Sequence, residues 1–175
     1  MILFLFEANP LLFIDQGFGL SAEYFVSSHL SLGAVGEFYL QEPYNTSGVE
    51  AKRDTYNIAP QARWYFFEGS GPFIGTKLVF AKTTAYISDP TETHSETINY
   101  MAPVGEVGYR FIFSDTVSFS MYLGLGVKTT STTLSESFIP ADRTQNAFWQ
   151  AALSELNDNQ SRTYVDYGFT LGFLF

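Results

Sequence analysis

The chain has 175 residues, enough for one domain but hardly for two, and its net charge of −9 excludes the basic surface that nucleic-acid binding requires. Hydrophobic residues make up 46% and aromatic residues 18% of the chain, whereas charged residues make up only 15%. An average soluble domain has roughly 25% charged residues. Cysteine is absent, which excludes disulfides, thiol nucleophiles and cysteine-based metal sites.

No apolar run reaches the ~20 residues that a membrane-spanning helix needs. The closed β-barrel is the other structure that satisfies every backbone polar group inside a bilayer. The composition therefore leaves two interpretations, a β-barrel in lipid or an unusually aromatic soluble β-protein.

Alternation of apolar with small or polar residues predicts the strands in chain order. We expect eight strands, at residues 2–8, 16–26, 30–41, 55–67, 72–87, 98–113, 116–132 and 162–175. The start of the first strand, Met1–Phe6, has neither the basic residues nor the cleavage site of a complete signal peptide. The alternative is that Met1–Phe6 is the remnant of a signal core.

The segment Val117–Lys128 shows which face of a strand meets lipid. Every second residue from Val117 to Val127 is large and apolar, and the residues between them are Ser, Tyr or Gly. Glycine weakens a strand unless neighbouring groups crowd close to it, and the inside of an eight-stranded barrel is narrow enough for such crowding. We therefore predict an all-β fold, a membrane-spanning eight-stranded antiparallel up-and-down β-barrel, with its apolar faces turned outward.

Short and long connections alternate along the chain, as they do between the two ends of an outer-membrane barrel. Short turns fall near residues 27–29, 68–72 and 114–115, and longer outer loops at about 42–54, 88–97 and 134–161. We treat residues 1–175 as a single transmembrane domain. An even number of strands places both termini on the periplasmic side.

Charged and amide side chains recur on the predicted lumen faces. An unpaired charge in a narrow, low-dielectric space is very costly, so these groups should pair and plug the barrel. A gated ion path and a catalytic carboxylate pair are the alternatives. The predicted lumen network consists of Glu7, Glu23, Glu37, Gln61, Arg63, Lys77, Glu106, Arg110 and Asp166.

The last outer loop contains a predicted helix at residues 147–156, because Trp149, Leu153 and Leu156 share one face at helical spacing. Two interpretations remain open for these three residues. They cover the mouth of the lumen, or they form an outer-loop surface that interacts with a partner, lipid or another cell.

Aromatic residues gather near both ends of the predicted strands, as they do in the girdles of membrane barrels. The predicted outer girdle contains Tyr44, Tyr56, Tyr86, Tyr100 and Tyr164. The predicted inner girdle contains Tyr24, Trp64, Phe66, Phe67, Phe73, Phe111, Phe113, Phe119, Phe173 and Phe175.

The C-terminal stretch Tyr167–Phe175, with its aromatic end, resembles the last strand of bacterial outer-membrane proteins, and the whole chain resembles the small OmpA/OmpX-like barrels. The segments Asn9–Leu20 and Gly105–Arg110 also resemble strands of these barrels in their pattern of residues. The resemblance implies a location in the bacterial outer membrane and a role for Phe175 as a signal to the barrel assembly machinery.

We expect a structural or surface-interaction role rather than an enzyme. The expected contacts are outer-membrane lipid, lipopolysaccharide and a possible cell-surface partner, with the barrel as a monomer. A lipid-modifying enzyme and a small channel or ligand carrier are the alternatives. His94 and Ser95 are the candidate catalytic pair, but neighbouring residues on a strand point to opposite faces. No phosphate-binding glycine loop or metal motif occurs, so we expect no cofactor and no metal.

Overall fold

The computed structural model describes residues 4–10, 17–113, 116–130, 133–143, 146–157 and 162–175. Its strands are β1 (Phe4–Ala8), β2 (Gly17–Phe25), β3 (Leu30–Leu40), β4 (Tyr44–Thr46), β5 (Val49–Phe67), β6 (Ser70–Ser88), β7 (Thr93–Phe113), β8 (Val117–Val127) and β9 (Thr163–Leu174). A short 3₁₀ helix, η2 (Glu136–Phe138), and one α-helix, α1 (Ala147–Asn157), lie between β8 and β9. Residues 2–3, the start of the first predicted strand, lie outside the described ranges.

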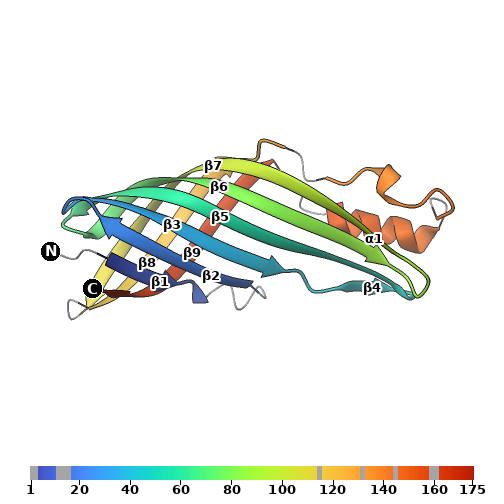
Figure 1. The fold of residues 1–175 in the computed structure, drawn as a ribbon, viewed down its shortest axis with the longest axis horizontal. Helices are drawn as coiled ribbons and strands as arrows, with labels where there is room; N and C mark the ends of the chain where they lie inside the picture. The colour runs from blue at the N-terminus through green and yellow to red at the C-terminus, as the bar shows by residue number, and fades with distance from the viewer. Residues whose placement is uncertain (1–3, 11–16, 114–115, 131–132, 144–145, 158–161) are drawn as a thin grey trace.

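Eight antiparallel strands form a closed ring, in the order β1, β2, β3, β5, β6, β7, β8 and β9. The ring closes where β1 pairs with β9, with Phe6 opposite Phe173. The ninth strand, β4, pairs among the described residues only with the Val49–Ala51 end of β5. Both termini lie at one end of the barrel and α1 lies at the other (Figure 1). The predicted eight-stranded up-and-down barrel is confirmed.

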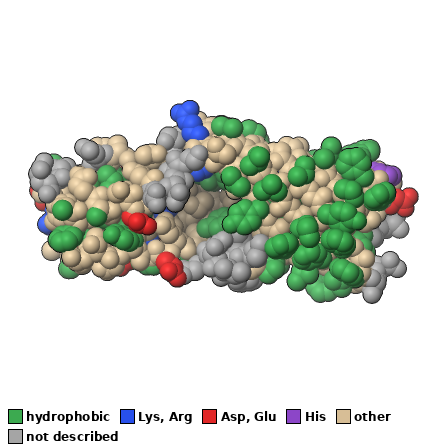
Figure 2. All heavy atoms as spheres, turned by 180° about the vertical axis from the view of Figure 1, so that it is seen from behind, with side chains coloured by type: hydrophobic (Ala, Val, Ile, Leu, Met, Phe, Trp, Pro, Cys, Tyr) green, Lys and Arg blue, Asp and Glu red, His purple; other side chains and the backbone are tan. Residues whose placement is uncertain are grey.

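The barrel wall is apolar on its outside. Leu123 and Leu125 of β8 and Val165 and Tyr167 of β9 are each 49–60% exposed, whereas the residues between them point inward. Apolar side chains crowd over the half of the molecule that carries the termini (Figure 2). A soluble fold would bury these side chains, so this surface suits hydrocarbon rather than water.

Two glycines show why the lumen face is rich in small residues. A Cβ on Gly75 would stand 2.7 Å from Glu106 Oε1, and a Cβ on Gly172 would stand 2.6 Å from Glu7 Cγ. Both distances are shorter than real Cβ contacts. Glycine therefore leaves room inside the ring for the larger charged side chains.

The longest strands continue well beyond the apolar band. Strands β5, β6 and β7 have 19, 19 and 21 residues, although about 9–11 residues suffice to cross a bilayer. The predicted outer loops 42–54 and 88–97 are therefore largely strand, and this part of the prediction is wrong. The strands persist because Val49, Ala51 and Ile87 continue the inward-facing pattern, while the outward side chains become polar.

The predicted helix is present as α1, one residue longer than expected. Its N-terminus is capped by Asn146, whose Oδ1 accepts a hydrogen bond from the Phe148 amide at 2.9 Å. At its C-terminus the Asn157 side chain bonds both backbone polar groups of Leu134. In the described ranges no helix is long and apolar enough to cross a membrane.

Candidate functional site: the lumen network and the outer extension

The structure places all nine predicted lumen residues inside the ring, each at most 7% exposed. They come from seven of the eight ring strands. They all point inward because every second residue of a strand faces the inside of the ring. Eight of the nine side chains form one continuous set of hydrogen bonds and ion pairs around Glu23 and Glu106. The ninth, Glu37, is bound separately.

Glu23 is the centre of the network. Its Oε1 accepts hydrogen bonds from Arg110 Nη2 at 2.9 Å and from Gln61 Nε2 at 3.2 Å, and it also pairs with Arg63 Nη1. Its Oε2 accepts from Ser31 Oγ at 2.8 Å. These donors offset the free-energy cost of removing the Glu23 carboxylate from water.

A second carboxylate, Glu106, extends the network along the barrel. Arg63 Nε donates to Glu106 Oε1 at 2.6 Å, and Lys77 Nζ lies 3.5 Å from Glu106 Oε2. Lys77 also pairs with Asp166. Arg63 therefore joins the Glu23 and Glu106 clusters into a single unit that spans the lumen.

Glu7 completes the network on the β1 side. Its Oε1 accepts a hydrogen bond from Ser120 Oγ at 2.9 Å, and the guanidinium groups of Arg63 and Arg110 lie 3.6 Å from its carboxylate oxygens. Glu37 instead accepts hydrogen bonds from Tyr39 Oη at 3.0 Å and Asn57 Nδ2 at 3.1 Å. The nine predicted lumen residues thus comprise five carboxylates, three cationic side chains and one amide.

Aromatic rings that the sequence analysis did not assign to the site pack against the cations. The Arg110 guanidinium lies 4.5 Å from the Tyr65 ring centre, and Lys77 Nζ lies 4.7 Å from that of Tyr122. Tyr65 also donates a hydrogen bond to Glu23. The inward position of Tyr65 could have been predicted from the sequence, because Tyr65 lies two residues after Arg63 on the same strand and therefore points to the same face.

Little open space remains around these groups. A cavity of about 10 Å³ lies beside Glu37 and Lys77, which is room for about one water molecule. Nearer the termini, Leu5, Phe25, Phe73 and Leu174 are buried together with Tyr65. The inward position of Phe73 contradicts its predicted place in the inner girdle, and Tyr100 is likewise buried rather than part of the outer girdle.

The outer extension consists of the parts of β5, β6 and β7 beyond the apolar band together with β4, η2 and α1. It has a hydrophobic core of its own, which we call the outer core. It contains Val49, Ala51, Ala85, Ile87, Leu134, Phe138, Ile139, Trp149, Ala152, Leu153 and Leu156. The three predicted interaction residues, Trp149, Leu153 and Leu156, are at most 5% exposed. They are therefore not an interaction surface, because the helix uses this face to pack on β4, β5 and β6. Arg53 Nη2 strengthens the contact by donating to the Leu156 carbonyl at 2.8 Å.

One edge of the extension is open. Strand β7 pairs with β6 from Thr93 onward but with β8 only from Val104. The Met101 amide and carbonyl bond Thr129, on the side away from β6. Because backbone groups alternate between the two sides of a strand, those of Thr97 and Asn99 point to the same side. This stretch has no backbone partner there among the described residues.

The candidate catalytic pair of His94 and Ser95 is split across β7. The His94 ring lies 6.0 Å from the Trp149 ring, next to the outer core, and its Nε2 lies 3.6 Å from Glu92. Ser95 is exposed on the opposite face. The described ranges also contain no group of three His, Asp or Glu side chains placed to hold a metal ion.

Comparison with solved structures identifies the architecture. Ail, the attachment invasion locus protein of Yersinia pestis, superimposes with a TM-score of 0.56 over 98% of this chain and 95% of that chain, at 8% identity. Ail in complex with the heparin analogue sucrose octasulfate gives a TM-score of 0.52 at 11% identity, over 98% and 94% of the two chains. The chain has the fold of the small OmpA-like outer-membrane barrels.

The N-terminal β-barrel domain of Pseudomonas aeruginosa OprF also matches, with a TM-score of 0.49 at 10% identity over 98% of this chain and 96% of that domain. No family model matches the sequence, and comparison with curated proteins gives no match either. In this chain the last residue, Phe175, is 73% exposed. Its backbone exchanges two hydrogen bonds with Phe4 where the ring closes.

Proposed function

We propose that this protein is an outer-membrane barrel that binds a macromolecular partner through its outer extension, with both termini in the periplasm. The observation that carries the proposal is the continuation of β5, β6 and β7 past the apolar band into a packed unit with an open β7 edge. Such a unit needs no loop ordering when a partner binds, and an open edge is a template for an added strand.

Charge limits the kind of partner. The predicted outer segments 42–54, 88–97 and 134–161 contain ten acidic and three basic residues. Ail has been solved with a heparin analogue, but an acidic surface opposes a polyanion. We therefore propose a protein partner with an extended, basic segment.

We propose that the lumen is plugged and that the protein is not an enzyme. The buried ion-pair network supports the plug, and the separation of His94 from Ser95 supports the absence of nucleophilic catalysis. We further propose that the barrel is a monomer surrounded by outer-membrane lipid and lipopolysaccharide, and that the assembly machinery recognises Phe175.

Adhesion of cells to plates coated with extracellular-matrix proteins tests the binding role. Cells that display the wild-type barrel should be retained, and Thr97→Pro should reduce retention to that of cells without the protein. The Thr97 amide faces the open edge, so its loss removes a donor for an added strand without breaking the ladder to β6. Thr97→Val, which keeps the amide, is the control. Equal retention of both variants would refute strand addition, and no retention of the wild type would refute the surface role.

A further inference from the structure

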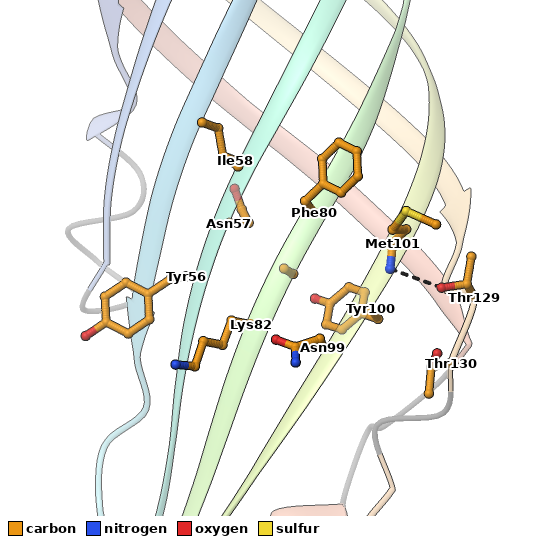
Figure 3. A pocket seen from close by; sticks show the side chains of 11 residues that line it. Tyr56, Asn57, Ile58, Phe80, Lys82, Asn99, Tyr100, Met101, Thr129 and Thr130 are labelled. Atoms are coloured by element: carbon orange, nitrogen blue, oxygen red, sulfur yellow. Dashed lines mark hydrogen bonds between the residues drawn. The ribbon is translucent and has the colours of Figure 1, made fainter.

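The outer wall of the barrel contains a groove where the apolar band ends. It has a volume of about 620 Å³ and lies over β5, β6, β7 and residues 129–130 (Figure 3). The groove is open to the surroundings of the barrel, and its lining also includes the inward-facing residues Asn57, Ala81 and Tyr100 of the same three strands. Its volume is within the usual range for a small-molecule site.

Strand register divides the groove into an apolar and a polar half. Ile58, Phe80 and Met101 face each other in one row across the three strands, and all three are exposed. One step further out, the row consists of Tyr56, Lys82 and Asn99. In Figure 3, Ile58 and Phe80 lie on one side of the groove, and Lys82 and Asn99 lie on the other.

This change marks the outer limit of the hydrocarbon. The next outward rows contain Asp54, Thr84 and Thr97, and then Lys52, Tyr86 and Ser95, so no apolar belt resumes beyond Tyr56. A group held at Lys82 would therefore lie at the level of lipid headgroups, with hydrocarbon on the side of Phe80.

Lys82 is suited to bind an anion. It is exposed, and within the described ranges its ammonium group has no hydrogen bond or ion pair. Lys52, two rows further out, is by contrast paired with Asp54 and lies over the Tyr86 ring. The far wall of the groove is fixed, because the Thr129 hydroxyl accepts a hydrogen bond from the Met101 amide and the Thr129 amide donates one to the Met101 carbonyl.

We propose that this groove binds a lipid of the outer leaflet that carries an anionic phosphate headgroup. The acyl chains lie on Ile58, Phe80 and Met101, and the phosphate binds the Lys82 ammonium with Asn99 beside it. A second groove, of about 400 Å³, lies over Gly108 and Gly168 within the apolar band. It contains no charged side chain, so we expect it to take acyl chains without selecting a headgroup. The proposal rests on the membrane location and does not require strand addition at the β7 edge, which Asn99 and Met101 share with the groove.

Native mass spectrometry of the folded barrel in a non-ionic detergent tests the proposal. Dioleoyl phosphatidic acid should remain bound to the wild type, and Lys82→Gln should weaken this binding about tenfold, as the loss of one charge-assisted hydrogen bond would. Asn99→Trp should weaken it by filling the groove. Lys52→Gln is the matched control and should leave it unchanged.

Two further ligands test whether the groove requires both the phosphate and the acyl chains. Dioleoylglycerol has the same chains without phosphate, and glycerol 3-phosphate has the phosphate without chains, so both should bind much more weakly. Equal binding of either probe, equal binding by Lys82→Gln, or equal weakening by Lys52→Gln would overturn the proposal. Each variant must first show the shift between boiled and unboiled samples in gel electrophoresis that marks a folded barrel.

Discussion

Replacing Trp149 by alanine should release α1 from the outer extension and leave the barrel intact. Trp149 is fully buried at the centre of the outer core, and truncating a buried aromatic to alanine costs about 3–5 kcal/mol. Helix α1 has 11 residues, and an isolated helix shorter than about 12–15 residues is marginal in water. Without its docked face, α1 should therefore unfold as well as detach.

Hydrogen–deuterium exchange of the folded protein measures this release. With about 1.4 kcal/mol for each factor of ten, protection of the α1 amides should fall at least a hundredfold. Amides of β8 and β9 should not change, because these strands make no large contact with α1. Phe148→Ala is the control, since Phe148 is the neighbouring aromatic residue but is 45% exposed. Equal losses in the two variants, or unchanged protection in Trp149→Ala, would refute the assignment of the outer core.

Three further predictions concern the lumen and the tip of the extension. Glu23→Gln should destabilise the barrel by about 3–5 kcal/mol in urea unfolding, because it leaves buried guanidinium groups under-compensated; Glu50→Gln, on the extension, should change little. Gly75→Val should abolish the fast-migrating folded band, whereas Gly36→Val, with open space at its Cβ, should fold. Hydrogen bonds from the Thr91 hydroxyl and amide lower the pKa of Asp89 to about 2, so its carboxyl should titrate in NMR near pH 2. A lowered pKa stabilises the turn fully above about pH 4, and this contribution should vanish as the pH falls through 2.

The barrel itself could be predicted from the sequence because two faces of each strand meet different surroundings. In β8 and β9, large apolar residues alternate mainly with small or polar residues such as Gly, Ser, Thr and Asp, and the order of short and long connections then fixes the topology. The same parity placed all nine charged and amide side chains inside. The same alternation decides whether an aromatic side chain points outward or inward. Phe73 and Tyr100 were wrongly placed in the girdles because they were assigned by their position along the strand and not by this alternation.

The outer extension could not be predicted in the same way, because the strands leave lipid there. Outward residues such as Lys52, Asp54 and Lys82 become polar, so the strand pattern resembles a loop. Helical spacing correctly grouped Trp149 with Leu153 and Leu156, but spacing identifies a shared face and not what covers it. Only the register of β5 and β6 shows that Ala51 and Ile87 stand opposite each other beneath the helix.

The outer core makes the extension behave like a small soluble domain that is carried on a membrane scaffold. Water drives its packing, whereas within the bilayer the hydrophobic effect favours no contact between apolar strands. Helix α1 has its main contacts with β4, β5 and β6 and none of comparable size with β1, β2 or β9. The unit could therefore be exchanged as a block by an engineer, or diversified under selection, without disturbing the ion pairs that hold the scaffold together.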